Sequence, residues 1–181
     1  EGIIVPNNFT RSITSPAGTA DVLENYLKVN LDAKNMHRVI KKTNACLVWG
    51  GSLKIAPADD IILEIEHPFN LDSENQMIAA ILAKKIGAGN KAVLIDIPVG
   101  PEAKVNSLKK ARQLQYKFEE IGRRNKLKVK VIITDGTKPI GYGVGSILEM
   151  RDVLLILANK PGAPQDLLNK SLDLAAELFV L

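Results

Sequence analysis

The sequence contains few of the residues that mark several large classes of protein. It has one cysteine among 181 residues, which excludes an internal disulfide framework; Cys46 lies in the apolar run 45–48 and is predicted to be a buried thiol. No apolar run is long enough to span a bilayer and no signal peptide is visible, so we expect a cytoplasmic protein without a membrane partner. His37, Asp59 and Asp60 lack a familiar metal-ligand spacing, so no metal is predicted.

Aromatic residues are also scarce, at 4%, which leaves few side chains on which nucleic-acid bases could stack. The net charge of +4 would suit an acidic partner, but the densest basic stretch, residues 109–124, is interrupted by Glu119 and Glu120. This alternation is typical of a solvated helix face. We therefore expect no nucleic-acid partner, and a small anionic substrate fits the charge better.

The hydrophobic pattern alternates between helical and strand periodicity, which predicts an α/β fold with a mixed, largely parallel sheet flanked by helices. Residues 57–60 could begin a short helix, although the β-branched run 61–65 would also suit a strand. The sequence has no repeat and no linker that would require two domains. We expect strands at residues 45–49, 92–97 and 128–134, and helices at residues 21–28, 32–42, 73–86, 107–124, 145–158 and 165–180.

Residues 11–21, RSITSPAGTAD, place hydroxyl groups and a glycine just before a helical pattern. The first turn of a helix leaves backbone N–H groups unpaired and carries partial positive charge, which favours oxyanions. Arg11 adds a planar fork that suits phosphate. The alternative is that Ser15 or Thr19 only caps the helix.

This segment resembles a motif of the nucleoside phosphorylase family that contains thymidine phosphorylase and the archaeal AMP phosphorylases. Further motifs follow in register, and together they span residues 9–155. HPFNLD and IDIPVGPEAKV are closer to the AMP phosphorylase branch. The motifs are 53–59 (LKIAPAD), 66–72 (EHPFNLD), 78–85 (IAAILAKK), 95–105 (IDIPVGPEAKV) and 134–152 (TDGTKPIGYGVGSILEMRD).

The resemblance implies that residues 1–181 are part of the central α/β domain of a phosphorylase, with the fold of nucleoside phosphorylases and phosphoribosyltransferases. The chain opens without methionine and lacks the family's upstream phosphate loop, so we expect an incomplete fragment, inactive alone. In the family, residues 57–89 cross to a small helical domain. We therefore predict that this segment exposes apolar surface or pairs with a second copy, and buried Leu82 and Ile86 would count against this.

The family reaction is phosphorolysis, in which phosphate attacks the anomeric carbon and the base leaves. Adenine departs more easily when it is protonated, so an acid near the base indicates a purine substrate. The resemblance makes Asp72 that acid. An Asp before a helix is also an ordinary N-cap, and a helix N-terminus lowers the pKa of a carboxyl, which opposes its action as an acid.

The resemblance also implies a set of substrate-binding residues. Lys84 would lie near the base, or be simply a cation in the last turn of a helix. Ala80 lacks the serine hydroxyl usual at its position, and His67 stands where thymidine phosphorylases carry an arginine. Lys104 would contact the nucleotide phosphate, or be solvated before a helix. The complete set is Thr10, Arg11, Ser12, Ile13, Thr14, Ser15, Thr19, His67, Ala80, Lys84 and Lys104.

The leading prediction is phosphorolysis of AMP to adenine and ribose 1,5-bisphosphate, with no cofactor, because inorganic phosphate is a substrate. The alternatives are a thymidine or pyrimidine nucleoside phosphorylase and a non-catalytic nucleotide-binding domain. A homo-oligomer, a dimer or larger, is expected from the resemblance. Gly141, Gly143 and Gly145 spell a glycine-rich loop, but Pro139 precedes it and we expect a tight turn rather than a dinucleotide site.

Overall fold

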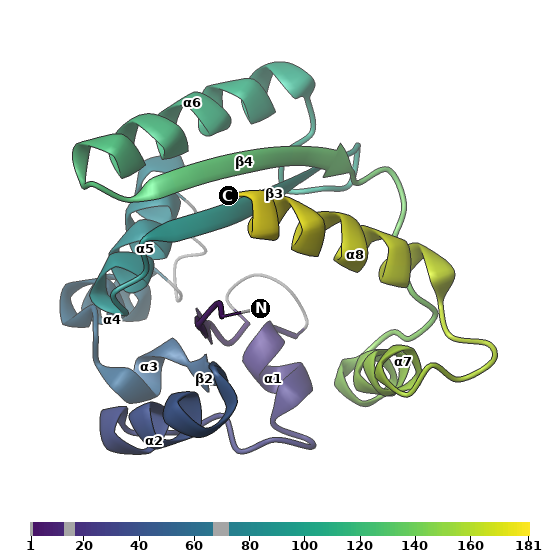
Figure 1. The fold of residues 1–181 in the computed structure, drawn as a ribbon. Helices are drawn as coiled ribbons and strands as arrows, with labels where there is room; N and C mark the ends of the chain where they lie inside the picture. The colour runs from purple at the N-terminus through teal and green to yellow at the C-terminus, as the bar shows by residue number, and fades with distance from the viewer. Residues whose placement is uncertain (1, 13–16, 67–72) are drawn as a thin grey trace. The chain divides into compact units, whose positions relative to one another are not determined.

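The structure is a computed structural model that describes residues 2–12, 17–66 and 73–181 (Figure 1). It divides the chain into two compact units. Unit 1 comprises Glu1–Gly89 with Gly143–Arg151, and unit 2 comprises Asn90–Tyr142 with Asp152–Leu181. The chain therefore folds as two units although its sequence shows no linker between them.

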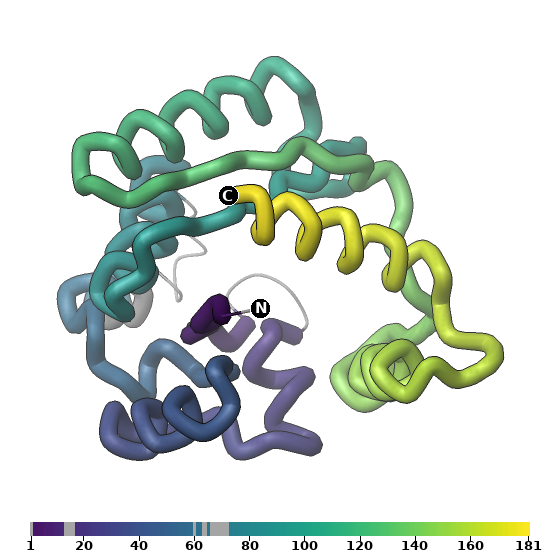
Figure 2. The backbone as a smooth tube through the Cα atoms, in the orientation of Figure 1, coloured from purple at the N-terminus to yellow at the C-terminus, as the bar shows by residue number. Residues whose placement is uncertain are grey.

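Unit 1 is built on two parallel strands, β1 (Val5–Phe9) and β2 (Ala45–Trp49), paired from Val5 opposite Ala45 to Phe9 opposite Trp49. Figure 2 shows the connection, in which the chain leaves β1, passes through α1 (Thr19–Leu23) and α2 (Ala33–Thr43), and returns beside β1. A helical crossover of this kind is what parallel strands require.

The helix α2 is amphipathic and covers β2. Its N-cap Asp32 accepts a hydrogen bond from the backbone N–H of Asn35 at 2.7 Å. The buried side chains Met36, Cys46 and Val48 form the core between helix and strand. The predicted burial of the single thiol is confirmed, and burial raises the pKa of Cys46.

The remaining helices of unit 1 after β2 are α3 (Gly50–Leu53), α4 (Pro57–Glu66) and α5 (Glu74–Gly87). Proline opens α4 at the position where its missing N–H costs least. Within residues 57–89, Leu82 is buried, whereas Ile61, Ile65 and Ile86 are exposed, and the predicted exposure of apolar surface or pairing with a second copy stays a prediction. This segment therefore carries both a buried and an exposed apolar side.

Unit 2 has a second parallel pair, β3 (Ala92–Val99) and β4 (Lys128–Asp135). Figure 1 shows α6 (Leu108–Arg124) above these strands and α8 (Gln165–Val180) below them. Ala111, Leu114 and Phe118 form the buried stripe of α6. A further helix, α7 (Ser146–Leu157), begins in unit 1 and ends in unit 2.

The predicted α/β class with parallel strands flanked by helices is confirmed. Residues 57–66 are helical throughout, so the strand alternative for 61–65 is wrong. The predicted helix 21–28 is also wrong in its bounds. It begins at Thr19, because the Asp21 side chain accepts from the N–H of Gly18, and it ends at Leu23. None of the helices within the described residues is long and apolar enough to cross a membrane.

Candidate functional site

The carboxyl ends of β1 and β2 lie side by side, because Phe9 pairs with Trp49 in a parallel register. Ligands of α/β sheets bind outside the carboxyl ends of the strands. The loop after β1 carries Thr10, Arg11 and Ser12, and α3 follows β2 directly at Gly50. Four predicted binding residues therefore lie at or near this edge: Thr10, Arg11, Ser12 and, exposed at the start of α1, Thr19.

The Arg11 guanidinium is held by α1 and by the end of β2. It forms ion pairs with Asp21 at 2.8 Å and with Glu24 at 2.6 Å, and its central carbon lies 4.9 Å from the centre of the Trp49 ring. The hydrogen bonds that Arg11 donates to Glu24 and Asp21 raise the pKa of Arg11. A phosphate would have to compete with two carboxylates for this cation, so phosphate binding by Arg11 stays a prediction.

The Asp21 carboxylate closes the loop that precedes α1. One of its oxygens accepts hydrogen bonds from the backbone N–H groups of Ser12 and Gly18, both at 2.8 Å. A Cβ on Gly18 would lie 2.5 Å from the Ser12 nitrogen, so only glycine fits there. The intervening Ile13, Thr14 and Ser15 lie outside the described residues, but the two ends of their loop are fixed to each other.

We expect the acid stability of the protein to depend on Asp21. The N–H groups of Gly18 and Ser12 lower its pKa, so the unfolded chain takes up a proton before the native state does. The free energy of unfolding should then fall as the pH drops below about 4. In Asp21→Asn this decline should be smaller, as measured by urea denaturation near pH 6 and pH 3. Asp173→Asn, at an exposed position on α8, is the control, and an equal effect in both variants would contradict the prediction.

Lys84, in the last turn of α5, is buried and charge-paired. Its ammonium lies 2.6 Å from the carboxylate of Asp59 on α4, and the two side chains are 8% and 6% exposed. The Lys84 carbonyl accepts a hydrogen bond from the buried side chain of Asn8 at 3.0 Å. A Cβ on Gly50 would lie 3.7 Å from the Lys84 side chain, which brings this predicted base-binding residue to the carboxyl end of β2.

Lys85 anchors the end of α5 to β1. Its ammonium donates to the Asn8 carbonyl at 2.8 Å and to the Asn7 side chain at 3.0 Å. Desolvation lowers the pKa of Lys85 from 10.5 to about 8.

This pKa predicts a second pH window in which stability rises with pH, with the same sign as the effect of Asp21 but at alkaline rather than acid pH. Between about pH 8 and 10.5 the unfolded chain binds more protons at Lys85 than the native state, so the free energy of unfolding should rise with pH. Lys85→Met should abolish this rise. Urea denaturation at both ends of the window tests it, with the exposed Lys160→Met as control. A rise that persists in Lys85→Met would show that another group causes it.

The predicted Lys104 lies in unit 2, in the exposed turn between β3 and α6. The turn is closed where the Gly100 N–H donates to the Val105 carbonyl at 3.2 Å. Lys104 therefore follows the carboxyl end of β3, as the sequence predicts. Its contact with a nucleotide phosphate stays a prediction.

Three N–H groups of the glycine-rich loop after β4 are taken up by carboxylates. Asp166 accepts from Gly141 at 3.3 Å, the buried Asp152 accepts from Tyr142 at 2.7 Å, and Glu149 accepts from Gly145 at 3.1 Å. A loop that already binds three carboxylates offers no cradle for phosphate. The predicted tight turn, rather than a dinucleotide site, agrees with this arrangement.

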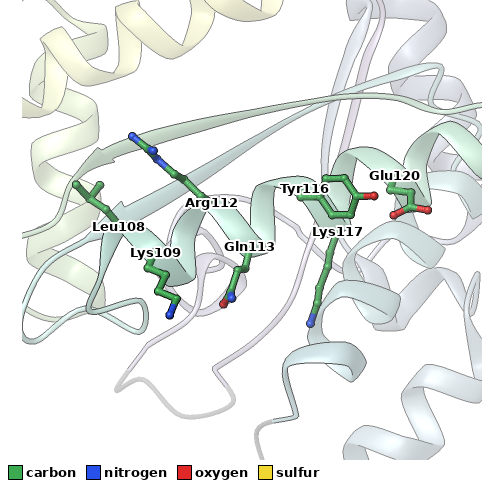
Figure 3. Close-up of a pocket in the computed structure, with 7 residues that line it drawn as sticks. All are labelled: Leu108, Lys109, Arg112, Gln113, Tyr116, Lys117 and Glu120. Carbon is green, nitrogen blue, oxygen red and sulfur yellow. The ribbon is translucent and has the colours of Figure 1, made fainter.

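Two hollows in unit 2 offer weaker candidates. Figure 3 shows the side chains that line the first, and all of those described belong to α6, so they form one side of a helix rather than an enclosed site. The second lies between β4 and α8, where Asp96 accepts from Thr134 at 2.7 Å and pairs with Lys170 at 2.7 Å. These polar groups satisfy one another within the unit.

The structure thus gathers the residues around Arg11 and Lys84 at one sheet edge, with Ala80 half-buried one turn before Lys84 on α5. His67 and Asp72 lie outside the described residues. Sequence reasoning missed Asp59 and Asn8, which contact Lys84, and Trp49, whose ring faces Arg11. The described ranges contain no cluster of three or more histidine, cysteine or acidic side chains that could hold a metal ion.

Parallel strands that end in a hydroxyl-rich segment beside buried and paired cations are typical of α/β proteins that bind phosphate-bearing ligands. No protein-family model matches the chain. The chain is, however, similar over nearly its whole length to curated proteins named "Putative thymidine phosphorylase" from Bradyrhizobium sp. (strain ORS 278), at 49% identity, and Methylococcus capsulatus, at 45%, each over 98% of the chain.

"Putative thymidine phosphorylase 1" of Acidovorax sp. (strain JS42) is 48% identical over 99% of the chain. This similarity supports the thymidine phosphorylase family that the motifs predict. The chain spans 34–35% of the length of these three relatives. None of the three is named an AMP phosphorylase, so that branch stays a prediction.

Proposed function

We propose that the protein is a nucleoside phosphorylase, a pentosyltransferase that moves the sugar of thymidine or another pyrimidine nucleoside from the base to inorganic phosphate. The structural observation that supports this best is the buried ion pair of Lys84 and Asp59 at the sheet edge that carries the hydroxyl-rich segment. The sequence motifs alone favour AMP as the substrate, whereas the names of the relatives favour thymidine.

The proposed roles follow from the chemistry of a sugar that develops positive charge while the base leaves with negative charge. The ammonium of Lys84 stabilises the negative charge on a pyrimidine oxygen, in a site where little water weakens the attraction. The hydroxyl groups of Ser12 and Thr19 hold the phosphate, because the backbone N–H groups of Ser12 and Gly18 are already bound by Asp21. Phosphate is a substrate here, so the proposal needs no cofactor.

The test is base release by the full-length protein, with thymidine, uridine or AMP and with or without phosphate, followed by chromatography. The proposal expects thymine or uracil to appear only when phosphate is present, together with the sugar 1-phosphate. Base release without phosphate would indicate a hydrolase. No base release from any of the three would contradict the proposed function.

AMP is the second candidate substrate, because the motif EHPFNLD ends in Asp72, the candidate acid, and carries His67 where thymidine phosphorylases have an arginine. If AMP is the substrate, Asp72→Asn in the full-length protein should lower adenine release by about 100-fold, since it removes a general acid. Asp173→Asn is the control. Thymine release that is unchanged in Asp72→Asn would instead leave Asp72 as a helix cap.

A further inference from the structure

Asp59 holds Lys84 by more than one contact. One oxygen of the carboxylate lies 2.6 Å from the Lys84 ammonium, and the other accepts a hydrogen bond from Gln76 at 3.2 Å. The backbone N–H of Asp59 donates to the Ala56 carbonyl at 3.0 Å, which fixes the start of α4. The carboxylate is thus restrained against rotation.

Lys84 is restrained at both of its ends. Its carbonyl accepts from Asn8, which ties the backbone to β1, and its ammonium is held by Asp59 on α4. A lysine has several rotatable bonds, and a catalytic contact requires most of that freedom to be removed before substrate binds. This arrangement removes it.

A lysine ammonium has three N–H donors, and in the structure one Asp59 oxygen lies 2.6 Å from it as its ion-pair partner. The proposal requires that another donor of this ammonium reaches an oxygen of the leaving base. Removing a cation from water is costly unless a carboxylate compensates it, so Asp59 is also what allows Lys84 to remain charged at a buried position.

We propose that Asp59 is a positioning residue, which orients the charged Lys84 so that its ammonium meets the leaving base. This proposal rests on the proposed function. The competing explanation is that the pair only joins α4 to α5. A purely structural cross-link would affect stability, but it would not change kcat separately from the KM for phosphate.

The test compares Asp59→Asn, Lys84→Met and the double variant in the full-length protein, with thymidine as the nucleoside. Asp59→Asn should lower kcat by about 10- to 100-fold, because a displaced catalytic group loses about that much, while the KM for phosphate changes less than about threefold. In the Lys84→Met background, Asp59→Asn should cause no further loss, because its effect acts through Lys84.

Two control variants separate positioning from general damage. Ile78→Val removes one methyl group from the buried side of α5 without touching the pair, and Glu120→Gln removes a carboxylate of α6 that pairs with Arg124. If Asp59→Asn is as active as Ile78→Val, or if its loss adds to that of Lys84→Met, the positioning role is overturned. If the wild-type protein releases no base, the proposed function is wrong. If the wild type releases base and Asp59→Asn is unaffected, only the positioning role is wrong.

Discussion

Gly100→Ala is expected to destabilise the protein by about 3 kcal/mol, because the new methyl group has no space. Gly100 follows β3 and is buried against Gly136, which follows β4. A Cβ at Gly100 would lie 2.1 Å from the Gly136 carbonyl oxygen and 2.7 Å from the Thr137 nitrogen. These neighbours are backbone atoms that are held in place, since the Gly136 N–H donates to the Val99 carbonyl at 2.8 Å.

The control for Gly100→Ala is Gly162→Ala. Gly162 has a φ of +82°, and no atom lies within 4 Å of the point that a Cβ would occupy, so alanine there costs only left-handed backbone strain, about 1–2 kcal/mol. Urea denaturation of both variants measures the two losses directly. Equal losses would mean that the loops after β3 and β4 can separate without cost. The turn that carries Lys104 begins at Gly100, so its geometry depends on this close approach.

The helices and strands with a strong local pattern could be predicted from the sequence. The apolar residues at helical spacing in α6, and the apolar run in β2, predicted where these elements begin and end to within one residue of the bounds in the structure. The strand β1 was missed, because Pro6, Asn7 and Asn8 have low β propensity. It forms through pairing with β2, almost forty residues later in the chain, and no local pattern contains that information.

The candidate site could be predicted only as a set of separate motifs. The sequence identified Arg11 and Lys84 by their segments, but not the carboxylates that neutralise them. Asp59 lies 25 positions before Lys84, at a spacing that no helix face relates, and it comes close only because α4 packs against α5. The sequence therefore indicates which cations are present, whereas the fold determines what compensates each of them.

Lys84→Met is expected to destabilise the protein by about 3–5 kcal/mol, because it leaves the buried Asp59 carboxylate without its cation. The double variant Asp59→Leu/Lys84→Met should recover most of this loss, since an apolar pair of similar volume is often as stable as a buried ion pair. Urea denaturation of both variants at neutral pH measures the difference. A double variant that is no more stable than Lys84→Met would show that packing, rather than charge, explains the loss.

The result of this comparison bears directly on why the pair exists. If the apolar double variant is as stable as the wild type but releases no base, the fold does not need the ion pair and the reaction does. If the double variant is both less stable and inactive, stability alone could account for the pair, and the role of Asp59 would depend on the kinetic test with Asp59→Asn. Burying the Lys84 and Asp59 charges costs desolvation free energy. Active sites accept such a cost because a preorganised charge stabilises the transition state.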